Sequence, residues 1–201
     1  KIQHALELVE TQTLLNFNKY LRNLLDEAAK KKSKGVIKLV ALPEFNFAFM
    51  KSNELLVKGF EHPKLKKVED IVKYEKLKND NVKIIIFTQF RETASIISKR
   101  LNSLSGVKAK VFIGQATKSG SSVEGLSQKE QKRIIEEFSE GEINVLCATS
   151  IGEEGLDIPE VNVVIFYETI PSAIRKIQRS GRTARLIEGK LIMLITKGTR
   201  D

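Results

Sequence analysis

Cysteine is almost missing from the sequence: Cys147 is the single one among 201 residues. One cysteine cannot form an intramolecular disulfide or supply a cysteine-based zinc site, and this usage is typical of a reducing cytoplasm. The two histidines, His4 and His62, are too far apart to suggest a metal pair, so no metal site is expected. There is no apolar run of about 18 residues and no signal-peptide pattern, so we expect a cytoplasmic protein without a membrane partner.

Positively charged residues outnumber negatively charged ones. The sequence has 34 lysines and arginines against 25 acidic residues, which gives a formal net charge of +9. This surplus favours a polyanionic partner such as nucleic acid, although it says nothing about the fold. Hydrophobic residues make up 41% of the chain. That share is enough for one ordinary core, or for one core with a small appendage.

The first third of the chain has a helical pattern. Residues 1–32 predict one long amphipathic helix, because apolar side chains recur every three to four positions. Residues 36–60 predict one or two helices, with a strand as the alternative. We therefore expect a helical segment over residues 1–61, ahead of a second domain over residues 62–201.

A different pattern begins near residue 82. Apolar β-branched runs alternate with helical periods, and Ser127 and Glu130 form a capping box before one of the helices. The strands are expected at 82–88, 107–113, 143–149, 161–167 and 190–196. The helices are expected at 93–104, 126–139 and 170–179, with an earlier one beginning at Pro63 and carrying an i,i+4 pair of Glu69 and Lys73. Apolar strands separated by helices indicate a parallel sheet covered on both faces, an α/β fold.

In such a sheet, functional groups gather beyond the carboxyl ends of the strands. That rule selects residues 88–90, 114–115, 149–152 and 168, where apolar strands stop at polar residues or glycine. Residues 114–125 are rich in glycine and serine and include two lysines. They predict either a basic loop near a nucleic-acid track or an ordinary insertion between strand and helix.

Three arginines stand at i, i+3 and i+6 in residues 178–185 (QRSGRTAR). A helical turn would gather them on one side, and an apolar core could not accept them. Guanidinium groups suit phosphate oxygens, so an anion is expected opposite them. The alternative is a solvated basic helix end.

Three segments together resemble a known family. Residues 85–90 (IIFTQF), 148–159 (ATSIGEEGLDIP) and 178–185 resemble motifs IV, V and VI of superfamily 2 helicases, in the family's order. The chain is thereby identified as the second RecA-like domain of such a motor. Residues 112–116 (FIGQA) and 126–131 (LSQKEQ) further resemble the archaeal Hef and Fanconi anaemia M-type DNA helicases. In that subfamily, and in RIG-I-like RNA ATPases, a helical insert precedes this domain, so residues 1–61 would be its end.

The resemblance implies a nucleotide site. Arg182 and Arg185 would reach the γ-phosphate of ATP as arginine fingers, with Gln178 beside the attacking water or the phosphate. Further residues implied at the nucleotide are Gly155, Asp157 at the ribose, and Arg179, for which an interdomain salt bridge is the alternative. Position 184 is alanine where the family usually has glycine, which favours Arg182 over Arg185 as the essential arginine.

The resemblance also implies a nucleic-acid track. Small hydroxyl and amide groups at strand ends suit contacts to a phosphate backbone, which position the strand without reading its sequence. The residues implied here are Thr88, Gln115, Thr149, Ser150 and Gly152.

Parts of a complete ATPase are missing from the sequence. No G-x-x-x-x-G-K-[S/T] loop is present, and residues 26–29 (DEAA) imitate the Mg²⁺-holding acidic box only superficially, because they keep a helical period. ATP and Mg²⁺ would be held mainly by a first RecA-like domain, the expected partner. We expect the chain to be a fragment that is inactive alone.

Three functions fit these patterns. The first is the C-terminal motor half of an ATP-dependent DNA helicase or translocase that acts on forked or branched DNA in DNA repair. The second is a double-stranded-RNA-dependent ATPase of the RIG-I-like type, and the third is a non-catalytic nucleic-acid-binding module. A Rossmann dinucleotide site is rejected, because no G-x-G-x-x-G follows a strand.

Overall fold

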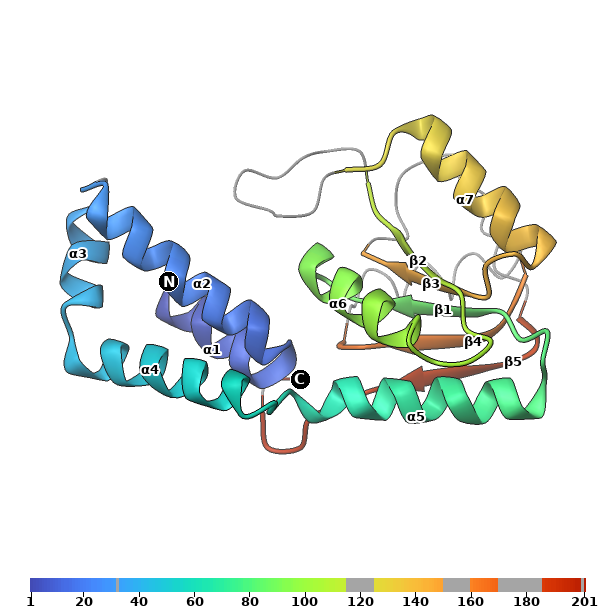
Figure 1. Cartoon of the computed structure of the whole chain (residues 1–201), viewed down its shortest axis with the longest axis horizontal. Coiled ribbons are helices and arrows are strands. Elements are labelled where there is room, and N and C mark those ends of the chain that lie inside the picture. The colour runs from blue at the N-terminus through green and yellow to red at the C-terminus, as the bar shows by residue number, and fades with distance from the viewer. Residues whose placement is uncertain (32, 115–124, 150–159, 170–185, 200) are drawn as a thin grey trace. The chain divides into compact units, whose positions relative to one another are not determined.

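The computed structural model describes residues 1–31, 33–114, 125–149, 160–169, 186–199 and 201, without the side chains of 186–188. Two units make up this part of the chain (Figure 1). Lys1–Leu65 and Thr196–Asp201 form one, called here the helical unit. Lys66–Ile195 form the other, the sheet unit.

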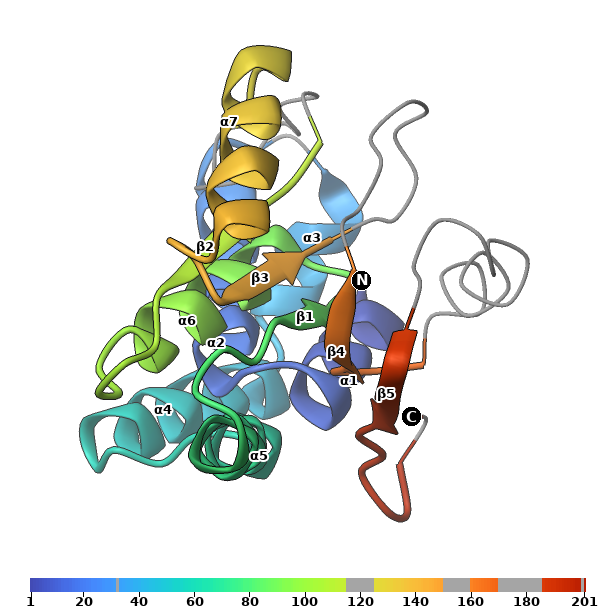
Figure 2. The same ribbon diagram turned by 90° about the vertical axis from the view of Figure 1, so that its right-hand side faces the viewer.

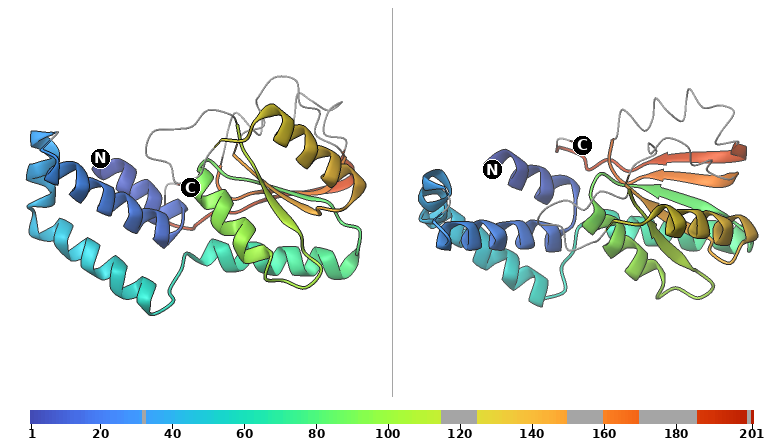
Figure 3. Two further views of the ribbon diagram at one scale, coloured as in Figure 1. Left: turned by 45° about the horizontal axis from the view of Figure 1, so that its top comes forward. Right: turned by 90° about the horizontal axis from the view of Figure 1, so that it is seen from above.

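The helical unit contains four helices, visible in blue to cyan in Figure 3. They are α1 (Ile2–Thr11), α2 (Leu14–Ala29), α3 (Lys34–Val40) and α4 (Pro43–Val57). The expectation of one helix over residues 1–32 was wrong. The backbone at Thr13 is extended, and its hydroxyl accepts a hydrogen bond from the backbone nitrogen of Asn16 at 3.1 Å, so a new helix starts there. Residues 36–60 are helical, as expected, and Pro43 opens α4.

A small apolar core holds these helices together. Its buried members are Leu21, Leu24, Val36 and Phe45, and α2 packs against α1, α3 and α4 around them. Many of the surrounding hydrophobic side chains are only partly buried. On α4, three large apolar side chains are mostly exposed: Phe47 (69%), Met50 (70%) and Val57 (89%).

Polar contacts supplement this core at the end of the helical segment. The Glu61 carboxylate accepts a hydrogen bond from the backbone nitrogen of Leu14 at 2.7 Å, which caps α2 from across the unit. His62 Nε2 lies 2.8 Å from the carbonyl oxygen of Glu10, and its Nδ1 accepts from the Lys64 backbone nitrogen at 3.3 Å. This pattern suits the neutral imidazole with its proton on Nε2. Burial lowers the pKa of His62 in agreement with that state.

An ion pair completes this region. Lys64 pairs with Asp201, and both side chains are buried. Asp201 also accepts a hydrogen bond from the Thr196 backbone nitrogen at 2.8 Å, so the residues after the sheet are tied back to the helical segment. The four residues Glu61, His62, Lys64 and Asp201 are called the polar junction below.

Within the described residues, the sheet unit forms a five-stranded parallel sheet in the order β2-β3-β1-β4-β5. The strands are β1 (Ile84–Phe87), β2 (Ala109–Phe112), β3 (Val145–Ala148), β4 (Val161–Phe166) and β5 (Leu186–Met193). The predicted α/β fold with a parallel sheet is confirmed. The last strand lies a few residues earlier than the expected 190–196, and the helix expected at 170–179 lies outside the described residues.

Helices cover both faces of the sheet. They are α5 (Pro63–Lys78), α6 (Arg91–Leu101) and α7 (Gln128–Glu140). Figure 2 shows α7 on one face and α5 and α6 on the other. The expected capping box of Ser127 and Glu130 opens α7, and Gly141 closes it in a left-handed conformation with φ of 84°.

The central strands β1, β3 and β4 are almost entirely apolar because both of their faces are buried. On the α7 face, strand residues pack with Ile134 and Phe138, and on the other face the alternate residues of the central strands are also buried. Cys147 lies on β3, and burial raises the pKa of its thiol far above the usual value, which leaves it unreactive. None of the helices in the described part of the chain is both long and apolar enough to cross a membrane.

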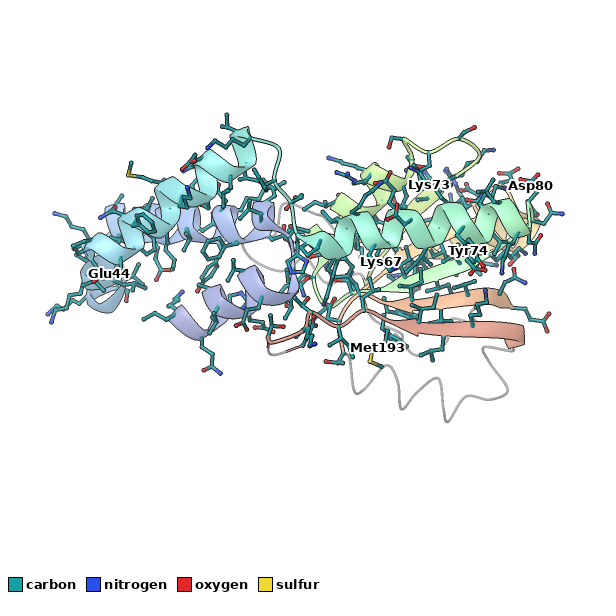
Figure 4. All side chains as sticks on the ribbon, turned by 90° about the horizontal axis from the view of Figure 1, so that it is seen from below. Glu44, Lys67, Lys73, Tyr74, Asp80 and Met193 are labelled. Atoms are coloured by element: carbon teal, nitrogen blue, oxygen red, sulfur yellow. The ribbon has the colours of Figure 1, made fainter. Side chains whose placement is uncertain are left out.

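Ionic contacts fix α5 beside the sheet. The predicted pair of Glu69 and Lys73 is confirmed at 2.9 Å, and Arg100 on α6 bonds the same carboxylate at 3.2 Å. Hydrogen bonds from Lys73 and then Arg100 hold the pKa of Glu69 at about 2. Nearer the other end of α5, where Figure 4 labels Tyr74, Glu75 pairs with a lysine of β5 at 2.7 Å.

Candidate functional site

The parallel register brings the carboxyl ends of four strands together. It pairs Phe112 with Ala148, Ala148 with Phe87, and Phe87 with Phe166. The residues that follow therefore lie side by side: Ile113, Thr149, Thr88 and Tyr167. This line of strand ends is called the carboxyl edge below. Its position confirms the expectation that the described polar groups selected from the sequence gather at one edge of the sheet.

Thr88 is the first residue after β1, and its side chain is fully buried. Its hydroxyl donates a hydrogen bond to Glu168 Oε1 at 3.2 Å. The same hydroxyl oxygen is 3.5 Å from the backbone nitrogen of Phe90, from which it accepts. The hydroxyl proton of Thr88 is thus engaged inside the protein.

Glu168 stands two residues after the end of β4, and only 4% of its surface is exposed. Besides the Thr88 hydroxyl, Oε1 accepts a short hydrogen bond from the backbone nitrogen of Gln89. One carboxylate oxygen therefore holds a hydroxyl and a backbone amide from the loop after β1. The strand-end rule selected Glu168 from the sequence without giving it a role.

Two further polar side chains support the carboxyl edge, and sequence reasoning missed both. Arg91 Nη2, in the first turn of α6, donates to the carbonyl oxygen of Gly114 at 2.9 Å. Gln131 Nε2, in the first turn of α7, donates to the carbonyl oxygen of Ile113 at 2.9 Å. Both side chains are buried and bind backbone carbonyls just beyond β2. They fix residues 113 and 114, where the segment rich in glycine and serine begins.

A signal for Gln131 was present in the sequence. Gln131 stands on the apolar stripe of its helix, three and seven residues before Ile134 and Phe138. A polar side chain on such a stripe must be buried, and buried polar groups need hydrogen-bond partners. In a helix that covers a parallel sheet, the nearest backbone groups are those at a strand end.

Thr149 follows β3 and lies at the carboxyl edge between the ends of β2 and β1. Its backbone nitrogen donates to the carbonyl oxygen of Phe112 at 3.3 Å, and its side chain is partly exposed. A partly exposed residue at a strand end is more accessible to an external phosphate than the fully buried Thr88.

The other predicted site residues lie outside the described residues, so their roles stay predictions. They are Gln115, Ser150, Gly152, Gly155, Asp157, Gln178, Arg179, Arg182 and Arg185. Across the described ranges, no group of three or more histidine, cysteine or acidic side chains is arranged to hold a metal ion.

The sequence matches a known protein family. The model of the helicase conserved C-terminal domain matches residues 63–187. That range begins with α5 and includes every strand of the sheet except the greater part of β5.

Individual relatives match the whole chain. A Methanocaldococcus jannaschii protein, provisionally named an ATP-dependent RNA helicase (MJ1505), is 46% identical over 201 residues, which are all of this chain and 24% of the relative. The ATP-dependent DNA helicase mph1 of Neurospora crassa is 36% identical over 208 residues, all of this chain and 18% of the relative. The chain thus spans a quarter or less of the length of these curated relatives.

A solved structure also matches along nearly the whole chain. The crystal structure of the Pyrococcus furiosus Hef helicase domain has a TM-score of 0.78 and 45% sequence identity. The match covers 98% of this chain and 39% of the Hef chain. The resemblance to the second RecA-like domain of Hef and Fanconi anaemia M-type helicases is confirmed.

Proposed function

Because the chain belongs to the helicase conserved C-terminal domain family, we propose that it is the second motor domain of an ATP-dependent DNA helicase or translocase that acts on forked or branched DNA. The observation that carries this proposal is the register of β1 with β3. It supports a shared nucleic-acid track, because the segments that resemble motifs IV and V leave the sheet at adjacent points of the carboxyl edge. We further propose that residues 1–61 are the end of a helical insert and residues 62–201 the motor domain, although residues 196–201 pack with the helical unit.

In this proposal, the arginines of residues 178–185 act on the nucleotide. ATP, with Mg²⁺, supplies the phosphoryl group and is held mainly by a first RecA-like domain of the same protein. Arg182 and Arg185 place fixed positive charge where negative charge develops during phosphoryl transfer. Gln178 would lie beside the attacking water or the phosphate, Asp157 would accept a hydrogen bond from the ribose, and Gly155 and Arg179 would complete the nucleotide side of this domain.

The carboxyl edge would follow the nucleic-acid backbone. Thr149, with Gln115, Ser150 and Gly152, contacts phosphates, which gives binding without sequence preference. The +9 charge of the chain supports such a partner. Among the relatives, one is named an RNA helicase and another a DNA helicase. The Hef-like segments at residues 112–116 and 126–131 favour DNA, and a double-stranded-RNA-dependent ATPase is the second candidate.

The substrate is tested by measuring ATP turnover of the full-length protein at one stated salt concentration. Forked DNA, single-stranded DNA and double-stranded RNA are compared. We expect forked DNA to stimulate turnover most. Stronger stimulation by double-stranded RNA would favour the second candidate. Absence of stimulation by all three would contradict a motor function and leave a binding module.

The catalytic assignment predicts the effect of Arg182→Ala in the full-length protein. Nucleic-acid-stimulated ATP turnover should fall by about 10³-fold or more, as for other arginine fingers, while affinity for forked DNA stays nearly unchanged. Arg133→Ala is the matched control, because Arg133 is an exposed arginine of α7 that pairs with Glu137 on the helix surface. Wild-type turnover in Arg182→Ala would refute the arginine-finger assignment.

A further inference from the structure

The loop after β1 has a buried part and an exposed part. The Thr88 side chain is fully buried, whereas the Gln89 side chain, one residue later, is exposed at the carboxyl edge. Both residues are held by the same carboxylate oxygen of Glu168, through the Thr88 hydroxyl and the Gln89 backbone nitrogen. The carboxylate thus sets the backbone from which the Gln89 side chain projects.

The chemistry of this contact excludes a direct phosphate contact by Thr88. A threonine hydroxyl has one proton to donate, and here that proton goes to a carboxylate. A hydrogen bond in a buried place is electrostatically stronger than in water, and water does not compete for it. A phosphate offers only acceptors at its oxygens, so it would have to displace Glu168 to bind Thr88. The exposed amide of Gln89 has two protons to donate and needs no such rearrangement.

We propose that Gln89 contacts the nucleic-acid backbone and that Glu168 is the positioning residue that fixes the loop bearing it. This inference rests on the proposed function, and it assigns to Thr88 an indirect role through Glu168. Glutamine amides are common donors to phosphate and sugar groups, and a donor on a fixed backbone loses less conformational freedom on binding. The position of Glu168 beyond β4 ties this loop to the stretch of chain that leads to residues 178–185.

The test is a double-mutant cycle in the full-length protein. Binding of labelled forked DNA is measured without ATP, and ATP turnover is measured over a range of DNA concentrations. Gln89→Ala should weaken binding about tenfold, the size expected for one lost hydrogen bond to a charged group. It should raise the DNA concentration for half-maximal turnover by the same factor and leave turnover at saturating DNA unchanged. Asn81→Ala is the control, because Asn81 is an exposed amide at the opposite end of β1.

Glu168→Ala should weaken binding to a similar extent, and the double variant should be no weaker than either single one, because both changes remove the same contact. Glu168→Gln keeps an acceptor oxygen and should restore most of the affinity. Wild-type binding by Gln89→Ala would overturn the inference. Additive losses in the double variant would also overturn it, because Glu168 would then act elsewhere.

The two proposals fail in different ways. If forked DNA binds but does not stimulate ATP turnover in the wild-type protein, the proposed motor function fails while the binding cycle still decides the role of Gln89. If the wild-type protein does not bind forked DNA, both fail. Gln89 is exposed, so its variant tests the inference even if Glu168→Ala does not fold.

Discussion

The two units of the chain are stabilised by different means. In the sheet unit, the central strands are apolar on both faces and almost completely buried, and α7 packs onto them through side chains such as Phe138. In the helical unit, the apolar core is small, and the polar junction supplies directional contacts at its edge. The two units therefore suit different structural roles. A tightly packed sheet gives the carboxyl edge a fixed frame, whereas the helices combine a small apolar core with a few polar contacts.

The largest expected effect comes from the same truncation made in each unit. Phe138→Ala should lower the free energy of unfolding of the sheet unit by about 3–5 kcal/mol, because the fully buried ring leaves a cavity. Phe45→Ala in the helical unit should cost less, about 2–3 kcal/mol, because its partly buried neighbours can move into the space. Urea unfolding, with hydrogen exchange to assign the loss to a unit, checks both. Equal losses would contradict the comparison.

A smaller effect should appear when the pH is lowered. Burial depresses the pKa of His62 in the folded state, so the unfolded chain binds a proton at higher pH than the folded chain does. Stability from this residue is therefore fully present above the usual pKa of 6.5 and is lost as the pH falls below it. His62→Gln should flatten the loss of stability of the helical unit between pH 7 and pH 5.

His4→Gln is the matched control for the pH experiment. The side chain of His4 is 40% exposed, and it is the only other histidine of the chain. Urea midpoints at each pH give the slopes, and the His62 variant should flatten the profile more than the His4 variant does. If both variants flatten the profile equally, the polar junction is not its source.

The smallest effect is expected on the exposed face of α4. Phe47→Ser should change the stability of the 201-residue chain by no more than about 0.5 kcal/mol, because the ring is mostly exposed in the helical unit. Comparing the thermal unfolding of Phe47→Ser with that of Phe45→Ala shows how much each of these two phenylalanines of α4 contributes to stability. A loss above 1 kcal/mol would mean that Phe47 is covered within this chain.

The sheet could be predicted from the sequence because burial on both faces leaves an apolar run that no other element of this length produces. The helical unit was harder to predict from the sequence. Thr13 falls on the stripe of residues 1–32 that recurs every three to four positions, so the helical period continues through it. In the structure its hydroxyl caps α2, and the stripe continues in a second helix. Periodicity alone does not reveal a break between two helices when the apolar positions keep the same spacing across it.

The candidate site was predictable to a similar degree. The strand-end rule located Thr88, Thr149 and Glu168 at one edge, because parallel strands end together. It did not reveal which polar group faces outward, because that depends on hydrogen bonds between residues about 80 positions apart, such as the bond from Thr88 to Glu168. The sequence pattern around Thr88 gave no sign that its hydroxyl proton was already used.

The central place of β1 has a consequence for how the chain acquires its structure. Ile84 pairs with Val145 on one side and with Val163 on the other. The strand β1 is therefore synthesised before both of its neighbours and cannot pair fully until both have been made. Such distant pairings slow folding, because the entropy of closing long loops is lost before the contacts form. During synthesis the helices of residues 1–57 can form from local contacts, while the apolar segment Ile84–Phe87 waits for its neighbours. That interval exposes an aggregation-prone strand, and a chaperone or rapid synthesis of the following residues would raise the yield of folded protein.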